Sequence, residues 1–305
     1  MADPASVGDS NCTASPDCAA VEWLIQPHHK DLCAFSVRRC LPVVGRKSVG
    51  PWVFFDHFGP VTLAAGPGPN VRPHPHVGLA TVSYLFEGEI LHRDSLGSVQ
   101  VIRRGDINLM VAGRGIVHSE RERPTATVVE RRLHGLQLWL ALPEADEETD
   151  PAFHHTPNAA IPALAIDGVT VRVMMGTAFG VTSPVKVFAQ TLYVEAQLRA
   201  GQSLVLPDAP ERALYVAQGQ VRVGSTDVRQ HAMAVLRVSS ADVTVNAQQA
   251  SRIALIGGEP LGRRFLEWNF VSSRKERIEQ AKQDWHEGRF PKVPGDEVEF
   301  VPLPQ

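Results

Sequence analysis

Two pairs of side chains that can bind metal lie in the first half of the sequence, at the same spacing. One residue separates His74 from His76, and one residue separates His118 from Glu120. On a β-strand, residues i and i+2 point to the same face, so each pair would present its two ligand atoms together. If the two strands are neighbours, about 4.8 Å apart, four ligand atoms converge on one ion. Three imidazoles and one carboxylate, without a thiolate, are typical ligands of a first-row divalent transition metal.

An octahedral ion with these four ligands would keep two positions open, as in a catalytic site and unlike a closed structural zinc site. Each pair alone is weak evidence, because such a pair on a β-protein is more often a polar surface feature. Gly113-Arg114-Gly115 turns the chain just before the second pair and strengthens the metal interpretation. A further pair, His92 and Asp94, has the same spacing. We interpret it as lining the site or orienting its ligands, and the alternative is that His92 replaces one of the four.

Short strands are expected to position these side chains. Runs rich in β-branched and aromatic residues alternate with Gly, Pro, Asp and Asn along most of the chain. The predicted strands are 53–58, 79–86, 99–103, 107–111, 136–142, 169–175, 187–198, 213–217, 220–223, 233–238, 243–246 and 253–256. Many short strands at this spacing predict an all-β sandwich or barrel. Residues 144–162 lack periodicity and are expected to connect two halves.

An internal similarity supports two related domains. Residues 84–90, YLFEGEI, resemble residues 215–221, YVAQGQV, in their aromatic start and turn glycine. The first histidine pair lies ten and eight residues before Tyr84, and the corresponding positions before Tyr215 are Val205 and Pro207. Neither residue can bind a metal, so the second domain is expected to lack an ion.

The composition excludes several classes of protein. The chain has 305 residues, with 30 Lys and Arg against 33 Asp and Glu and a net charge of -3. It therefore lacks the broad basic face that binding to nucleic acid requires. No apolar stretch approaches the roughly 18 residues of a membrane-spanning helix, and the polar residues 1–18 contain no apolar region of a signal peptide. A cytoplasmic protein is expected.

Four cysteines lie in the first 40 residues, at Cys12, Cys18, Cys33 and Cys40. Their spacing is not that of a zinc ribbon or an iron–sulfur site. Free thiols in a reducing compartment are favoured, and the alternative is a disulfide or a redox pair.

One helix is predicted near the C-terminal end. Ser273 and Glu276 form a capping-box pattern, in which each side chain satisfies an N–H group of the first turn. Ile278, Ala281 and Trp285 follow at helical spacing, and Gly288 ends the helix. This apolar face is expected to pack against a sheet.

Several motifs, taken in order, resemble the pirin family of bicupin proteins. HPHVGLAT at residues 74–81, leading to YLFEG, resembles the family's first metal-binding motif. FFDHFGP at 54–60 and AGRGIVHSE at 112–120 resemble its other N-terminal signatures. WNF at 268–270 and the predicted helix resemble its C-terminal segment. The resemblance covers roughly residues 20 to 300.

This resemblance implies an all-β fold of two tandem cupin β-barrels, of the RmlC-like jelly-roll type, with a C-terminal helix. The expected domains are a metal-binding cupin at 20–143 and a cupin without metal ligands at 163–300. The family's metal ligands match His74, His76, His118 and Glu120, the same set that the spacing predicts. Many cupins carry an additional Glu where this chain has Ala80, so Glu120 must supply the carboxylate.

The resemblance also implies an activity. The expected enzyme is an oxidoreductase similar to quercetin 2,3-dioxygenase, which opens the ring of a flavonol with dioxygen and releases carbon monoxide. Glu120 is the candidate catalytic base, because it is the only carboxylate of the set. One divalent ion per chain is expected, with Fe(II) favoured over Mn, Ni, Co or Cu, in a monomer.

Two other functions remain open at this point. One is a non-catalytic, metal-containing regulator that binds other proteins, a role that the resemblance also implies. The other is a cupin isomerase or hydrolase that uses the same ligands. The fold does not distinguish them, because function depends on the site.

Overall fold

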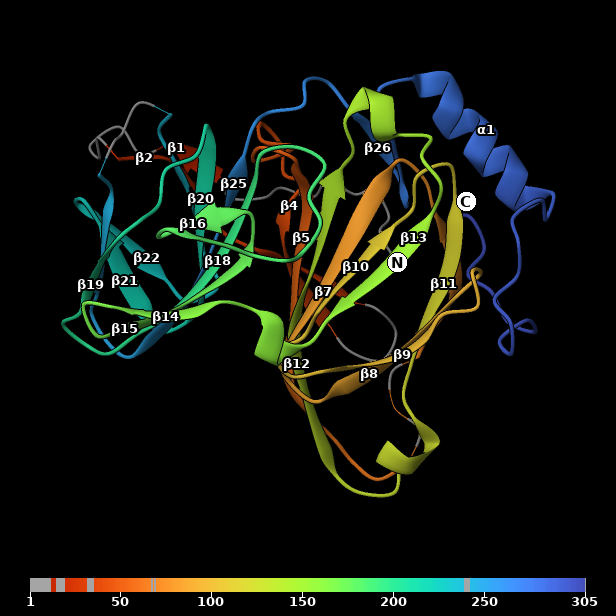
Figure 1. Cartoon of the computed structure of the whole chain (residues 1–305), viewed down its shortest axis with the longest axis horizontal. Coiled ribbons are helices and arrows are strands. Elements are labelled where there is room, and N and C mark those ends of the chain that lie inside the picture. Colours follow the sequence, from red (N-terminus) through yellow and green to blue (C-terminus); the bar gives the residue numbers. More distant parts are fainter. Residues whose placement is uncertain are drawn as a thin grey trace.

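Two β-barrels in tandem form the molecule in the computed structural model (Figure 1). The structure describes residues 12–14, 20–31, 36–66, 68, 70–238 and 242–304. This architecture confirms the all-β expectation of two barrels with a C-terminal helix.

The first barrel has a sheet of seven strands facing a sheet of four. The seven strands are, in order, β13 (Ala152–Thr156), β10 (Ile107–Val111), β7 (Leu79–Glu87), β12 (Arg131–Ala141), β5 (Trp52–Leu63), β4 (Ser36–Leu41) and β3 (His28–Asp31). The four strands are β6 (Val71–His76), β11 (Ile116–Arg121), β8 (Glu89–Asp94) and β9 (Val99–Arg103). Both sheets are antiparallel throughout.

The second barrel repeats this plan. Its larger sheet has the order β1 (Cys12–Ala14), β2 (Val21–Ile25), β23 (Met233–Leu236), β20 (Glu211–Gln218), β25 (Ser251–Gly258), β18 (Thr191–Leu198), β15 (Val169–Met175) and β14 (Ala163–Ile166). The smaller sheet has the order β19 (Ser203–Val205), β24 (Thr244–Ala247), β21 (Gln220–Val223) and β22 (Thr226–Arg229). Short elements complete the fold: η1 (Pro124–Ala126), η2 (Glu144–Asp146), η3 (Asn158–Ala160), β16 (Thr177–Ala178), β17 (Val181–Thr182), β26 (Phe265–Glu267), β27 (Phe270–Ser272) and the helix α1 (Lys275–His286).

The sequence similarity between residues 84–90 and 215–221 has a structural counterpart. Tyr84 lies in β7 and Tyr215 in β20, and both strands end at a glycine with positive φ, 87° at Gly88 and 86° at Gly219. Glycine adopts this conformation without the steric penalty that a Cβ atom brings. The two segments therefore make the same turn in the two barrels.

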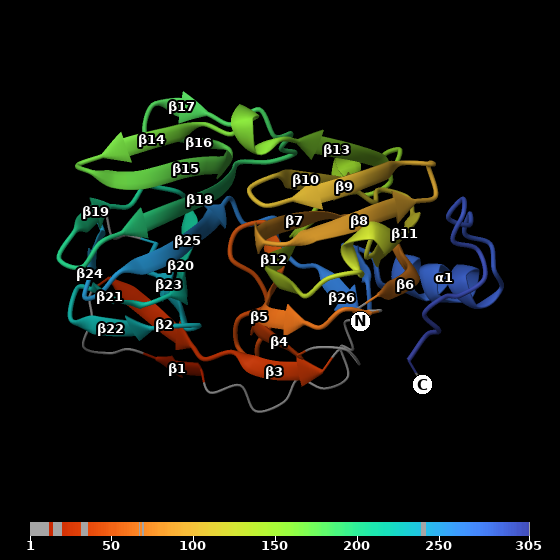
Figure 2. The ribbon, with the colours of Figure 1, turned by 90° about the horizontal axis from the view of Figure 1, so that it is seen from below.

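The chain ends cross between the barrels. Strand β2 pairs with β23 of the second barrel, although its residues fall within the range 20–143 expected for the first domain. Strands β26 and β27 and helix α1 lie against the first barrel, and α1 lies at the end away from the second barrel (Figures 1 and 2). Strand β13, in the expected connection 144–162, pairs with β10. The domain bounds remain a prediction. The pairing of β2 with β23 and of β13 with β10 crosses the limits expected for the first domain.

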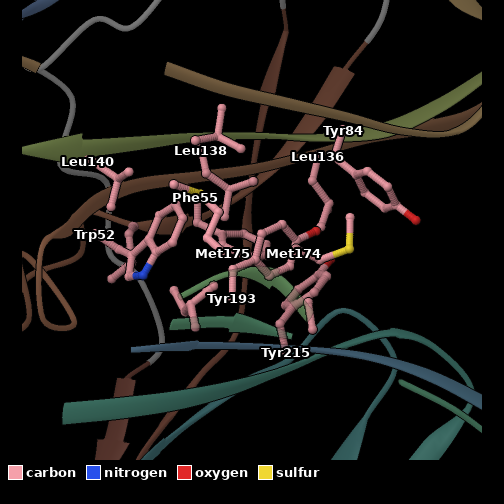
Figure 3. Close-up of a cluster of buried hydrophobic side chains, with 14 of the residues drawn as sticks. Trp52, Phe55, Tyr84, Leu136, Leu138, Leu140, Met174, Met175, Tyr193 and Tyr215 are labelled. Atoms are coloured by element: carbon pink, nitrogen blue, oxygen red, sulfur yellow. The ribbon is translucent and has the colours of Figure 1, made fainter. Parts of the chain in front are cut away.

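A continuous hydrophobic core lies between the two barrels (Figure 3). Phe55 of β5 packs on Tyr215 of β20, with ring centroids 4.6 Å apart. The buried indole of Trp52 donates to the carbonyls of Leu192 and Gly257, at 3.2 and 3.0 Å. Because these contacts are buried and join residues of both barrels, the barrels are held as one body rather than as two linked domains.

The helix prediction is correct in its buried face and wrong in its cap. Ile278 and Ala281 are buried, and Trp285 packs against the same cluster. The helix begins at Lys275, however, and its N-cap residue makes no side-chain cap hydrogen bond. The Ser273 hydroxyl donates to Glu147 instead, at 3.0 Å. A tertiary carboxylate therefore takes the group that the capping box would use.

The cysteine prediction is tested at one position. Cys40 is a buried free thiol, and its sulfur lies 3.7 Å from the carbonyl oxygen of His231. Cys18 and Cys33 lie outside the described residues, as does the side chain of Cys12. Among the described helices, none has the length and apolar character needed to cross a membrane.

Candidate metal centre

Strands β6 and β11 bring three of the four predicted ligands together, the histidines His74, His76 and His118. They are antiparallel neighbours, and His118 lies directly opposite His74. The residues between the two pairs explain this arrangement, because Gly78 and Gly113 have positive φ and form the turns that lead into and out of β7 and β10. The condition set in the sequence analysis, that the two strands are neighbours, is met.

Three histidines form a compact buried cluster. One ring nitrogen of each of His74, His76 and His118 lies within 4.8 Å of the others. The ring centroid of His118 is 4.4 Å from that of His74 and 5.0 Å from that of His76. Within the described part of the chain, this is the one group of three or more His, Cys, Asp or Glu side chains with metal-binding geometry.

The nitrogens of this cluster fit a bound transition metal. Nδ1 of His74 donates to the carbonyl of Arg72 at 2.8 Å, which leaves the lone pair on Nε2. Nδ1 of His76 and Nε2 of His118 are buried and have no hydrogen-bond partner among the described residues. Buried polar atoms without a partner are costly, and a divalent ion would satisfy them.

Burial also keeps the three imidazoles neutral. Loss of hydration lowers the pKa of His74 to about 3, with a smaller opposite contribution from its backbone hydrogen bond. Desolvation holds the pKa values of His76 and His118 well below the ordinary value, and the neighbouring histidines lower them further. Neutral imidazole is the form that binds a metal.

Asp94 and His92 extend the cluster behind His118. His92 Nε2 lies 3.0 Å from Asp94 Oδ2, and His92 Nδ1 lies 3.4 Å from His118 Nδ1. A carboxylate only accepts hydrogen bonds, so His92 donates from Nε2 and accepts at Nδ1. His118 then carries its proton on Nδ1 and its lone pair on Nε2. This geometry matches the orienting role predicted for the pair.

Glu120 lies in the same cavity but does not join the histidine group. The register between β11 and β6 shifts between His118 and Glu120, and such a bulge re-aims the next side chain. The half-buried Glu120 carboxylate lies 3.5 Å from the Ser83 hydroxyl. Desolvation raises its pKa above the ordinary value, against a smaller opposing effect of His92. Its role as fourth ligand stays a prediction.

An aromatic wall closes one side of the cavity. Trp139 stacks on Phe54, with ring centroids 3.9 Å apart, and its ring lies nearly perpendicular to that of His76, with centroids 5.1 Å apart. Arg39 and Asp56 line the same cavity, and Arg39 donates two hydrogen bonds of 2.8 and 2.7 Å to Asp56. The cavity beside the histidines has a volume of about 90 Å³.

Several residues of this cavity were not found from the sequence. Gln137 accepts the Ser83 hydroxyl at 2.9 Å and lines the cavity. Gln137 is the polar residue in the apolar run 136–142, and this exception to the pattern could have marked it as a candidate site residue. Asn269 also lines the cavity, but it comes from the far end of the chain, where no local pattern indicates this placement.

Comparisons with known proteins agree with this geometry. A family model described as Pirin matches residues 34–140, and a model described as Pirin C-terminal cupin domain matches residues 193–291. The chain belongs to the pirin family. A pirin-like protein of Caulobacter vibrioides is 45% identical over 289 residues, which cover 93% of this chain and 100% of the relative. The two barrels are thus the two cupin domains of a pirin.

Among the solved structures, this pirin is similar in fold to an enzyme with a named activity. A crystal structure of quercetin 2,3-dioxygenase from Acinetobacter baumannii has a TM-score of 0.86 and 32% identity, covering 92% of this chain and 94% of that one. A bacterial pirin from Escherichia coli, solved in complex with nickel(II), has a TM-score of 0.59 at 19% identity. It covers 77% of this chain and 96% of that one, and shows the same fold.

Proposed function

We propose that this pirin-family protein is a metal-dependent dioxygenase that opens the ring of a flavonol such as quercetin. The observation that carries the proposal is the buried cluster of three neutral histidines beside an aromatic-walled cavity. The similarity in sequence and fold to a quercetin 2,3-dioxygenase supports the choice of substrate. Dioxygen would be the second substrate.

The proposed ligands are His74, His76, His118 and Glu120, which hold one ion per chain. Fe(II) is the proposed metal, with Mn, Ni, Co and Cu as alternatives that the same donors accept. When bound, the ion would act as a Lewis acid that stabilises negative charge on the substrate oxygen. We further propose that the protein works as a cytoplasmic monomer.

Glu120 is the proposed base for the 3-hydroxyl of the flavonol. Desolvation raises the pKa of this carboxyl, and a raised pKa brings a base closer to the operating pH. A carboxylate has enough lone pairs to bind an ion and to accept a proton from the substrate.

The aromatic wall would orient the substrate. Pockets that enclose a molecule of this size measure about 300–1,000 Å³, and the cavity here measures about 90 Å³. Only the reacting edge of the flavonol therefore fits beside the histidines. Trp139 and Phe54 provide the apolar surface that this edge would contact.

The test replaces the proposed base while keeping its shape. Glu120→Gln retains one oxygen acceptor and removes the charge and the basicity. Metal-loaded Glu120→Gln is expected to lose oxygen uptake with quercetin by about 10² to 10⁴, the range of general-base catalysis, and to bind the flavonol more nearly as the wild type does. Glu267→Gln, in a surface ion pair with Lys282, is the control. Full turnover of Glu120→Gln with a full metal content would remove Glu120 as the base.

The small cavity also favours a second candidate function. A metal-containing protein that binds other proteins would need no room for a flavonol. Its ion would shape a surface and would not turn over a substrate. Oxygen uptake separates the two functions. If the protein is a regulator, the wild type loaded with each candidate metal and supplied with several flavonols will consume no oxygen.

A further inference from the structure

A second and larger cavity lies at the junction of the two barrels. Its volume is about 380 Å³, within the range of pockets that bind small molecules. Residues of both barrels and of the segment between them line it: Tyr84, Phe86, Arg104, Asn158, Arg172 and Arg252 among them. Junctions between domains are common places for ligand sites.

The lining carries an excess of positive charge. Glu195 is the one acidic side chain of the wall, beside three arginines. The Tyr84 hydroxyl donates to Glu195, and Arg252 Nε lies 3.4 Å from it. Glu195 also lies opposite Arg172 in the pairing of β15 with β18. One carboxylate can offset only one of the three guanidinium charges, so the wall keeps an excess of positive charge.

Neutral groups hold the guanidinium of Arg172 in place. Arg172 donates to the Tyr84 hydroxyl at 3.0 Å, to the Gly105 carbonyl at 2.9 Å and to the Asn158 side chain at 2.6 Å. Within the described residues, no carboxylate pairs with Arg172 or with Arg104, which is exposed at the same cavity. A fixed guanidinium needs little reorganisation to bind an anion.

The other cavity of the molecule provides a contrast. There, Arg39 is paired with Asp56, Arg121 with Asp296 and Arg131 with Glu122. Each of these three arginines forms an ion pair with a carboxylate of the protein. At the junction, Arg104 and Arg172 both line the cavity, and neither has an ion-pair partner among the described residues.

We propose that the junction cavity binds a small organic oxyanion, a carboxylate or a phosphate monoester. Arg104 and Arg172 would hold the anionic oxygens, since the planar guanidinium matches both groups in geometry. The rings of Phe86 and Tyr84 at the wall would contact the organic part. Figure 3 shows Tyr84 at the edge of the inter-barrel core, with its hydroxyl pointing away from the other labelled side chains. A bound anion would contact both barrels.

The probes are benzoate and phenyl phosphate, which share one ring and differ in the anionic group, with benzyl alcohol as the uncharged control. Binding is measured by titration calorimetry on the metal-loaded protein. At least one of the two anions is expected to bind, and its affinity should fall as NaCl screens the charges. Benzyl alcohol is not expected to bind. The anion that binds identifies the class. Equal binding of benzyl alcohol, or no binding of either anion at millimolar concentration, would overturn the proposal.

Variants locate the binding. Arg104→Glu reverses a charge at an exposed position that has no ion-pair partner among the described residues. It is expected to weaken binding by about tenfold to a hundredfold. Arg229→Glu makes the same change in net charge on β22, away from the cavity, and should leave affinity unchanged. His76→Ala should also leave it unchanged. Loss of binding in His76→Ala with retention in Arg104→Glu would place the anion on the metal and refute the inference, whatever the enzymatic activity proves to be.

Discussion

At the scale of single residues, one carboxylate decides which nitrogen of His118 is available for an ion. Asp94 Oδ1 accepts the backbone N–H groups of Leu96 and Ser98, at 2.9 and 3.0 Å, while Oδ2 accepts from His92. The two oxygens therefore have separate tasks. One holds a turn, and the other fixes a tautomer.

Asp94→Asn separates these tasks. The amide keeps an oxygen for the turn and offers an N–H donor to His92, which must then accept at Nε2 and donate from Nδ1. His118 would accept that proton at Nδ1 and carry its own on Nε2, where the ion needs the lone pair. Metal affinity is expected to fall about 10- to 100-fold, measured by competition with a chelator.

The control for this variant is Asp106→Asn. Asp106 is also buried and also accepts backbone N–H groups, from Arg103 and Asn158, but it contacts none of the three histidines. It should leave metal affinity unchanged. Equal affinity of Asp94→Asn and the wild type would show that His118 does not depend on this hydrogen bond.

His76→Ala is expected to remove the ion and keep the fold. The side chain contributes one of three clustered nitrogens, while apolar strands form the core of the barrel. Elemental analysis should give one ion per chain for the wild type and a large loss for the variant, with an unchanged circular dichroism spectrum. Two tightly bound ions per wild-type chain, or an unfolded variant, would contradict this expectation.

Residue spacing alone predicted most of the candidate site. An alternation of two residues on a strand needs no tertiary information, so His74, His76 and His118 could be grouped correctly. The shift at Glu120 could not, because a bulge depends on how the neighbouring strand pairs. The same limit applies to Asn269, which reaches the cavity only through the tertiary fold.

At the scale of elements, the turn between β6 and β7 brings the C-terminal segment onto the metal-bearing barrel. Gly78 has a φ of 70°, and a Cβ atom built there would lie 1.9 Å from the carbonyl oxygen of Val271 in β27. Val271 N–H donates to the carbonyl of Val77 at 3.0 Å. The backbones can approach this closely only because position 78 has no side chain.

Gly78→Ala should therefore lower the free energy of unfolding by more than the backbone strain of an alanine with positive φ would explain. An alanine with positive φ costs about 1–2 kcal/mol, and the clash with Val271 adds to this. Gly97→Ala is the matched control, since Gly97 has a φ of 89° and a Cβ atom there meets nothing within 4 Å. Urea unfolding of both variants tests the difference. Equal losses of stability would mean that β27 moves away at no cost.

Strand prediction succeeded where the strand itself is apolar. The bounds 99–103, 107–111, 169–175 and 220–223 agree with the observed strands. Strands β8 (EILHRD) and β13 (AFHHT) were missed because charged residues and histidines interrupt their apolar pattern. Pairing with neighbouring strands, and not intrinsic propensity, makes these segments strands.

At the scale of the whole molecule, buried histidines couple stability to pH. Desolvation lowers the pKa of His74 to about 3 and those of His134 and His231 to about 4, and holds His57 well below the ordinary value. Above pH 6.5 the folded and unfolded chains both hold these groups neutral. As the pH falls below 6.5, the unfolded chain binds protons that the folded chain does not, so the free energy of unfolding decreases.

Metal-free protein is expected to lose stability steadily from pH 6.5 downward. The slope is about 1.4 kcal/mol per pH unit for each fully buried histidine that stays neutral. Urea unfolding at a series of pH values between 7.5 and 5 measures it. His286→Gln, at the exposed end of α1, should give the same profile as the wild type. A free energy of unfolding that is constant over this range would contradict the prediction.

The crossing of the chain ends has a consequence for synthesis. His118 is made 151 residues before Asn269, which lines the same cavity. At 5–20 residues per second, about 8 to 30 s pass on the ribosome between the two. During that time the nascent barrel has its histidines but lacks the segment that forms one of their walls. The ion therefore has an open route to its ligands before the chain is finished.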